Sequence, residues 1–297
     1  MKLVSVVVAT YRREAELKNA LASLAAQTYP NMEIVLVDDN GITEWNEKVA
    51  EIVAAFRSQS PEISLQYITN APNQGSAKTR NIGIEAAGGE YITFLDDDDV
   101  YLPEKVARQV AFMEEKGCDY SITDLHLFNE KDQLTDRRIR SYIEETTVDA
   151  LQRYHLLHHI TGTDTMMFRK DYLLGIGCFA PIDVGDEYYL MQRAIEGGGK
   201  FGYLPGFEVK AYVHTGEGGL SSGEGKIKGE NALYAYKKQY FGSIAAKDRR
   251  YIRMRHYAVL AFAYLRLRKY LRCITNCMIA GLISPIGCIR MLKNSRQ

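Results

Sequence analysis

Short apolar runs alternate with amphipathic helical patterns through the first 116 residues. The helical pattern after the first run places Leu17, Leu21 and Leu24 on one face. Continuous β-branched or aromatic runs of this length are typical of strands buried on both faces of a parallel sheet. The expected strands are 3–9, 33–37, 63–69 and 91–95, and the helices after Leu24 are 44–57, 76–87 and 103–116. This alternation predicts βαβ units, so we expect an α/β fold with a Rossmann-type, mostly parallel sheet flanked by helices.

The pattern becomes irregular after residue 117. Short strands are expected at 119–123, 164–168 and 207–213, separated by loops rich in Gly, Asp and His. A helix is expected to begin near Asp186, and from about residue 229 the pattern is helical and rich in Tyr and Arg. The sequence therefore predicts a carboxy-terminal helical extension.

Charge is unevenly spread along the chain. The 297 residues carry 37 bases and 37 acids, yet residues 247–297 hold 12 of the bases and one acid, Asp248. A basic module is thus attached to an acidic one. The five cysteines are too few and too scattered for a disulfide framework or a zinc site. The first residues lack a cleavable signal pattern, so we expect a reducing, cytoplasmic setting. The basic tail adds the expectation of a place at the inner face of the cell membrane.

Four aspartates, Asp96 to Asp99, directly follow the apolar run 91–95. Ligands of open α/β sheets collect at the carboxyl ends of the strands. Carboxylates gathered there are suited to a hard divalent ion that also binds a substrate's phosphates. The alternative is a solvated acidic loop that leads into the helix beginning near Pro103.

Two other strand ends carry polar groups. Thr10, Tyr11 and Arg12 follow the first strand, and Asp38 and Asp39 end the second. Parallel strands bring such ends together along one edge, where a carboxylate suits a ribose hydroxyl or a base N–H. Taken singly, each is also consistent with ordinary turn chemistry.

Four segments in this order resemble family 2 glycosyltransferases of the GT-A fold. They are Val6 to Arg12, Val35 to Asp39, Asn73 to Asn81, and Tyr91 to Asp99 with Pro103. The resemblance implies inverting transfer of a sugar from a nucleotide-diphosphate sugar to an acceptor hydroxyl. It places that reaction in bacterial cell-surface polysaccharide or glycolipid assembly, with a saccharide or lipid-linked acceptor.

The resemblance also implies residue roles on the donor side. Lys78 and Arg80 would lie near the base or the phosphates. The residues implied to hold the nucleoside are Thr10, Tyr11 and Arg12, with Asp38 or Asp39. The D-x-D element would be Asp96-Asp97-Asp98, with Asp98 a direct ligand of Mn²⁺ or Mg²⁺. The four-residue run leaves Asp97 and Asp99 open as ligands, and His214 is implied as a further metal or phosphate contact.

The acceptor side is implied by the segment that begins at Asp186 and Glu187. It is similar to the family's E-D-x-x-L-x-x-R helix with the two acids exchanged. Register from Leu190 and Arg193 makes Glu187 the general base, and the exchange leaves Asp186 as a rival. The alternative is that both acids simply favour a helix amino terminus.

The chain is expected to divide into a glycosyltransferase domain at 1–225 and a basic helical extension at 226–297. Within the domain, 1–117 would bind the nucleotide sugar and 118–225 the acceptor. The basic tail favours helices with peripheral membrane contact through 247–297 rather than nucleic-acid binding. Two rival functions remain: a sugar-phosphate nucleotidyltransferase, which would need a Gly-rich loop after the first strand, and a catalytically silent nucleotide-binding module.

Overall fold

The computed structural model describes residues 1–182, 185–213 and 223–294 of the chain. Its contacts divide the chain into two compact units. We call the first the sheet unit (Met1–Leu151 and Ile160–Val213) and the second the helical unit (Gln152–His159 and His214–Gln297).

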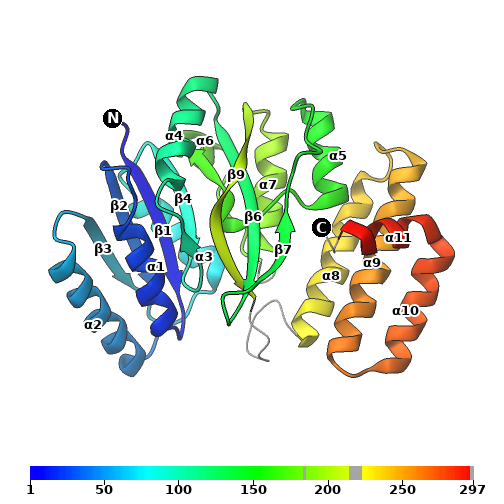
Figure 1. The fold of residues 1–297 in the computed structure, drawn as a ribbon, viewed down its shortest axis with the longest axis horizontal. Helices are drawn as coiled ribbons and strands as arrows, with labels where there is room; N and C mark the ends of the chain where they lie inside the picture. The colour runs from blue at the N-terminus through cyan, green and yellow to red at the C-terminus, as the bar shows by residue number, and fades with distance from the viewer. Residues whose placement is uncertain (183–184, 214–222, 295–297) are drawn as a thin grey trace. The chain divides into compact units, whose positions relative to one another are not determined.

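The sheet unit begins with four alternating strands and helices (Figure 1). They are β1 (Val4–Thr10), α1 (Ala15–Ala25), β2 (Met32–Asp38), α2 (Thr43–Gln59), β3 (Ser64–Thr69), α3 (Ser76–Ala86), β4 (Tyr91–Asp96) and α4 (Lys105–Lys116). β1 pairs in parallel with β2 and β4, and β2 pairs in parallel with β3. The predicted βαβ arrangement is therefore confirmed over this half.

The sheet continues beyond β4 with mixed strand directions. The short strand β5 (Val100–Tyr101) lies between β4 and α4. The later elements are β6 (Tyr120–Asn129), β7 (Leu134–Arg138), α5 (Val148–His158), the 3₁₀ helix η1 (Thr163–Thr165), β8 (Met167–Arg169), α6 (Lys170–Gly175), α7 (Asp186–Glu196) and β9 (Phe201–Val213). Among the described residues, nine strands form one sheet in the order β3-β2-β1-β4-β8-β6-β9-β5, with β7 paired to β6. β6 and β9 are parallel, whereas β5, β7 and β8 pair antiparallel to their neighbours.

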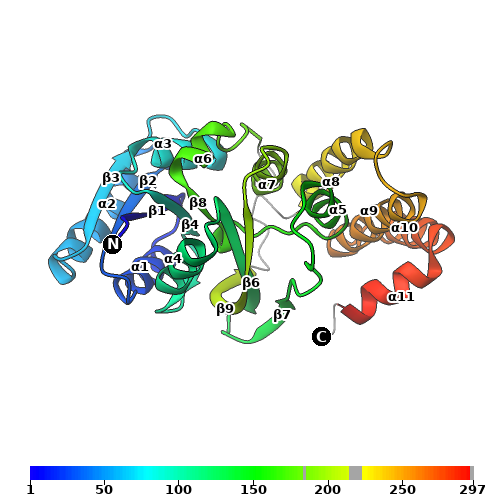
Figure 2. The same ribbon diagram turned by 90° about the horizontal axis from the view of Figure 1, so that it is seen from above.

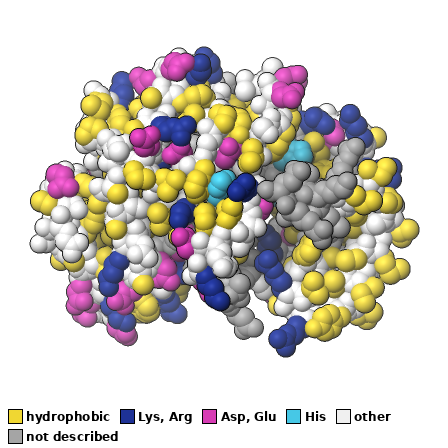
Figure 3. All heavy atoms as spheres, in the orientation of Figure 1, with side chains coloured by type: hydrophobic (Ala, Val, Ile, Leu, Met, Phe, Trp, Pro, Cys, Tyr) yellow, Lys and Arg dark blue, Asp and Glu magenta, His cyan; other side chains and the backbone are white. Residues whose placement is uncertain are grey.

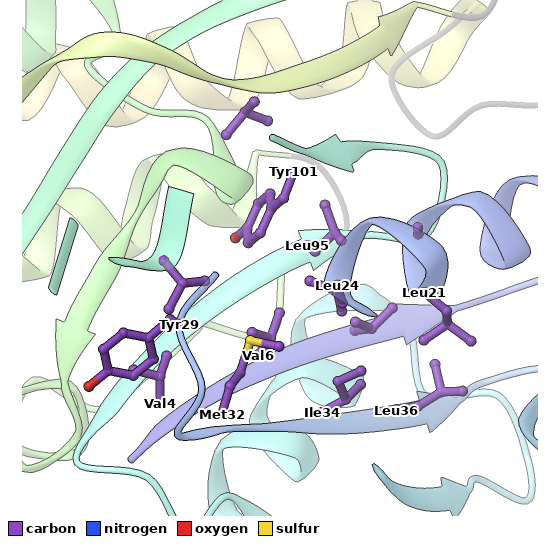
Figure 4. Close-up of a cluster of buried hydrophobic side chains, with 14 of the residues drawn as sticks. Val4, Val6, Leu21, Leu24, Tyr29, Met32, Ile34, Leu36, Leu95 and Tyr101 are labelled. Atoms are coloured by element: carbon purple, nitrogen blue, oxygen red, sulfur yellow. The ribbon is translucent and has the colours of Figure 1, made fainter. Parts of the chain in front are cut away.

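Helices cover both faces of the sheet. Figure 2 shows α1 and α4 on one side and α3, α6 and α7 on the other. The core on the α1 side brings Val6 and Ile34 of the strands against Leu21 and Leu24 of α1 (Figure 4). Neighbouring residues of a strand point to opposite faces, so Val7 lies on the other side of the sheet, next to Gly83 of α3. Both Val6 and Val7 are buried, so β1 is covered on both faces.

The predicted carboxy-terminal helices are present in the helical unit. They are α8 (Gly223–Lys237), the 3₁₀ helix η2 (Lys238–Tyr240), α9 (Ala246–Arg266), α10 (Tyr270–Ile283) and α11 (Pro285–Asn294). No helix in the described part of the chain is both long enough and apolar enough to cross a bilayer.

Candidate active site at the carboxyl ends of the strands

Strand register brings the polar strand ends side by side. Thr10 at the end of β1 is paired with Asp38 at the end of β2, and Ala9 is paired with Asp96 at the end of β4. The edge expected from the sequence therefore exists in the sheet unit, and the aspartate run lies next to the segment that follows β1.

Asp38 and Asp39 are buried and are held by hydrogen bonds within the edge. One oxygen of Asp38 accepts the Tyr67 hydroxyl at 2.8 Å, and the other accepts both nitrogens of Asn40, at 2.9 and 2.7 Å. Asp39 accepts its bonds from the loop that opens α3. The donors to Asp39 are the backbone N–H groups of Gln74 and Gly75 and the side-chain amide of Asn70. These carboxylates fix the shape of the loop beside the predicted nucleoside position.

Asp97 joins the aspartate run to the end of β1. Its Oδ2 accepts the Thr10 hydroxyl at 2.7 Å and the Tyr11 backbone N–H at 3.1 Å. Asp98 lies next to it and forms a 2.8 Å salt bridge with Arg13. Burial, and then the charge of Asp98, raise the pKa of Asp97 to about 7. Asp97 thus orders the loop after β1, whereas Asp98 is held from the side by a cation.

Tyr11, Arg12 and Lys78 are the exposed members of the predicted nucleotide-binding set. Arg12 has a left-handed backbone (φ 52°), and its N–H donates to Oδ1 of Asn40 at 2.7 Å. Its guanidinium lies 5.1 Å from the centre of the Tyr11 ring. An aromatic ring and two cations therefore stand at the solvent side of the edge.

Arg80 has a different environment from Lys78. It is buried, and its two terminal nitrogens bind two different carboxylates, Asp96 at 2.6 Å and Asp186 at 2.7 Å. The Ser76 hydroxyl also donates to Asp186, at 3.3 Å. Arg80 therefore links the end of β4 to the start of α7, and its charge is already shared between two acids.

A third acid, Asp164, completes a carboxylate cluster with Asp96 and Asp99. One oxygen from each lies within 4.8 Å of the others. Oδ1 of Asp164 accepts the Asp96 backbone N–H at 2.7 Å, and Asp99 accepts the Tyr212 N–H at 2.8 Å. Burial, followed by the charge of Asp96, raises the pKa of Asp164 to about 7, and burial with Asp164 raises that of Asp99. Arg80 is the one cation bound to these three acids in the described residues, so the cluster has more carboxylates than positive charges. Such a set of oxygen donors fits a hard divalent cation.

Asp164 is a site residue that the sequence pattern did not reveal. The strand predicted at 164–168 is wrong in its first residues, because the structure has η1 over Thr163–Thr165 and starts β8 at Met167. The available signal was an acid two residues before the apolar run that begins at Met166. That signal becomes informative only once β8 is known to pair with β4.

The two acids that start α7 differ in their surroundings. Asp186 is buried, binds Arg80, and accepts the Glu187 backbone N–H on its other oxygen at 3.0 Å. Glu187 is half-buried, and burial followed by the charge of Asp186 raises its pKa to about 7. Both oxygens of Asp186 are thus occupied by partners, while Glu187 has a pKa suited to proton transfer near neutral pH. The remaining predicted contact, His214, lies outside the described residues.

Comparisons with known proteins identify the family of the chain. A model of the family "Glycosyl transferase family 2" matches residues 5–173, more than half of the chain. The chain is 29% identical to the putative teichuronic acid biosynthesis glycosyltransferase TuaG of Bacillus subtilis over 57% of this chain and 63% of TuaG. The first curated relatives that it matches are covered over 20% to 55% of their length.

Two solved structures share the fold. One is Staphylococcus aureus TarS residues 1–349 in complex with UDP-GlcNAc, with a TM-score of 0.62 and 19% identity over 92% of this chain and 89% of TarS 1–349. The other is the mannosyltransferase PcManGT of Pyrobaculum calidifontis in complex with GDP-Man and Mn²⁺. It has a TM-score of 0.63 and 15% identity over 99% of this chain and 82% of PcManGT. At this identity the likeness shows the fold alone.

Proposed function

This chain belongs to glycosyltransferase family 2, and we propose that it transfers a sugar from a nucleotide-diphosphate sugar to an acceptor hydroxyl, with inversion at the anomeric carbon. One observation carries the proposal: Arg80 binds both Asp96, in the predicted donor site, and Asp186, beside the predicted base. The groups needed to bind a diphosphate and to activate a hydroxyl would therefore act in one site.

Glu187 is our choice for the general base. A base must be unprotonated and within reach of the acceptor hydroxyl, and a pKa near 7 lets it accept that proton at neutral pH. Asp186 is less suited, because its two oxygens are bound to Arg80 and to the Glu187 N–H. Asp186 would instead position the start of α7.

The cluster of Asp96, Asp99 and Asp164 would hold a divalent ion, Mn²⁺ or Mg²⁺. Asp98, the ligand predicted from the sequence, is not one of these three acids and is bound by Arg13, and we propose that it turns to the ion when the donor is bound. When bound, such an ion neutralises negative charge on the leaving diphosphate. Around it, Asp97 would keep the loop after β1 in place through Thr10 and Tyr11. The Tyr11 ring and the cations Arg12 and Lys78 would contact the nucleotide from the solvent side.

The relatives guide the choice of substrates. TarS is described with UDP-GlcNAc, PcManGT with GDP-Man and Mn²⁺, and TuaG with teichuronic acid biosynthesis. We therefore propose a UDP- or GDP-sugar donor and a cell-surface saccharide or lipid-linked acceptor, used at the cytoplasmic face of the membrane. Family membership does not favour the nucleotidyltransferase alternative.

A donor screen tests this function. The full chain is incubated with UDP- and GDP-sugars in Mn²⁺ or Mg²⁺, and release of the nucleoside diphosphate is measured with and without EDTA. We expect release from one donor class that EDTA suppresses and Glu187→Gln slows. Formation of pyrophosphate from a nucleoside triphosphate and a sugar phosphate, with no use of nucleotide sugars, would contradict the proposal.

A further inference from the structure

Helix α10 exposes most of its large apolar side chains to solvent. Besides Tyr270, the exposed side chains are Leu271, Ile274, Met278 and Leu282 of α10 and Ile286 and Ile289 of α11. Leu271 and Leu282 are 80% and 83% exposed, so packing within the helical unit does not account for them. We call these six side chains the α10 face, and Figure 3 shows hydrophobic side chains gathered over this part of the molecule.

The four positions on α10 form one continuous stripe. They are spaced by three or four residues, so they share one side of the helix. The opposite side carries Ala280, which is 2% exposed, and α10 packs there against α9. Single exposed apolar residues are common on soluble proteins, whereas a contiguous patch of this kind marks an interaction surface.

Basic residues stand at both ends of this stripe. At its start lie four exposed bases of the α9–α10 connection and first turn: Arg266, Arg268, Lys269 and Arg272. At its end lies a cavity of about 420 Å³ lined by Arg249, Arg250, Arg253, Phe241, Ala246 and Ile283. Arg250 donates to the carbonyl of Ile283, the residue after Leu282, and so joins the cavity to the α10 face.

Acids do not balance these bases. Asp248 is the single acid in 247–297, and it is buried and bound bidentately by Arg153 at 2.7 and 3.1 Å. Glu224 of α8 neutralises one base, Lys269. The apolar stripe is therefore framed by a net positive charge.

We propose that the α10 face docks on a membrane surface that contains anionic lipids, with α10 lying along that surface. The apolar stripe would enter the boundary between headgroups and acyl chains, and the arginines at both ends would contact lipid phosphates. A second copy of this chain fits the face less well, because it would bring two sets of bases together without acids to pair with them. The inference does not depend on the proposed sugar transfer, since membrane binding is measured without donor or acceptor.

Vesicle co-sedimentation of the full chain tests the proposal. The probes are vesicles of phosphatidylcholine alone and vesicles with about one third phosphatidylglycerol, each at low and high salt. We expect binding to the anionic vesicles that weakens as salt rises, because salt screens the arginines. Light scattering of the protein without vesicles measures self-association in parallel.

Matched variants separate the apolar from the basic contribution. Leu271→Glu with Leu282→Glu should lower the partition coefficient at least tenfold, while Leu134→Glu with Leu174→Glu, exposed leucines of the sheet unit, should leave it unchanged. Arg253→Gln with Arg266→Gln should lower it by about fivefold per charge removed. Lys131→Gln with Arg137→Gln is the charge-matched control in the sheet unit.

Three outcomes would overturn the proposal. The first is an equal loss of vesicle binding in the α10 variants and in their controls. The second is equal binding to neutral and anionic vesicles at all salt concentrations. The third is a wild-type protein that binds no vesicles but forms a dimer, which Leu271→Glu dissociates. The last result would assign the face to a second copy of the chain. Circular dichroism melting verifies that each variant is folded, because these side chains are exposed and their replacement should leave Tm unchanged.

Discussion

Nη1 of Arg80 lies 2.7 Å from Oδ2 of Asp186, and its Nη2 lies 2.6 Å from Oδ1 of Asp96. The arginine comes from α3, while the acids come from the start of α7 and the end of β4. A planar guanidinium can bind two carboxylates in fixed directions, which a lysine cannot do. Arg80 therefore sets the distance between the predicted donor site and the predicted base.

Replacing Arg80 should destabilise the protein. Arg80→Met leaves Asp96 and Asp186 without their shared cation in a largely buried place, so the free energy of unfolding should fall by about 3–5 kcal/mol. Urea unfolding followed by circular dichroism measures this change. Lys78→Met removes an exposed cation from the same helix and should change stability by less than about 0.5 kcal/mol. Equal effects of the two variants on stability would show that the two salt bridges of Arg80 do not hold the site together.

Glu187→Gln should slow the chemical step far more than it weakens donor binding. Loss of a general base typically costs a factor of about 10²–10⁴ in rate. Single-turnover kinetics with the identified donor measure the step, and titration calorimetry measures donor affinity. The matched variant Asp186→Asn should affect stability and positioning as well as rate. If Asp186→Asn alone removes the chemical step, the register assigned to the two acids is wrong.

The same assignment predicts the pH dependence of the wild type. Burial and the charge of Asp186 raise the pKa of Glu187 to about 7, and a base works only when unprotonated. The value of kcat/KM should therefore be low at pH 6, rise through about pH 7 and level off above it. An ordinary glutamate would already be ionised at pH 6 and would give a flat profile there. A profile without an inflection near pH 7 would argue against Glu187 as the base.

Much of the fold follows from local sequence pattern. The runs that became β1, β2 and β4 are continuous and β-branched or aromatic, and strands buried on both faces need that composition. The second half was harder to predict, because β8 spans only Met167–Arg169 and its role depends on pairing with β4 and β6. A strand of three residues leaves too short a pattern to identify reliably.

The site was predictable in its members but not in its pairings. Asp96, Arg80 and Asp186 were each expected near the substrate from motifs, yet the salt bridges that join them span 16 and 106 positions. Local pattern cannot specify contacts of that range, since they arise from the packing of α3 and α7 on the sheet. Asp164 was missed for the same reason.

Asp98→Ala should abolish metal-dependent turnover while the fold is kept. Asp98 is half-buried beside Arg13, so its removal should cost little stability but would take a hard oxygen donor from the predicted metal site. Activity after EDTA treatment and Mn²⁺ titration measures the requirement, and calorimetric Mn²⁺ titration measures affinity directly. Glu62→Ala, which removes an exposed acid beside β3, is the control for surface charge. Unchanged Mn²⁺ dependence in Asp98→Ala would exclude Asp98 as a ligand.

Gly83→Ala tests whether α3 must lie close to the sheet for Arg80 to reach its partners. A Cβ at residue 83 would stand 2.4 Å from Cγ1 of Val7, which is buried in β1 and has no room to move. Forced overpacking of this kind costs about 1–3 kcal/mol. Because Arg80 lies one helical turn before residue 83, the change should also displace its guanidinium and lower activity.

Gly281→Ala in α10 is the matched control, because a Cβ added at residue 281 would meet no neighbouring atom within 4 Å. That change should instead stabilise the protein by about 0.5–1 kcal/mol, since alanine favours helix over glycine. Thermal unfolding and activity of both variants test whether the position of α3 matters. If Gly83→Ala is as stable and active as the wild type, α3 can move without disturbing the two salt bridges of Arg80.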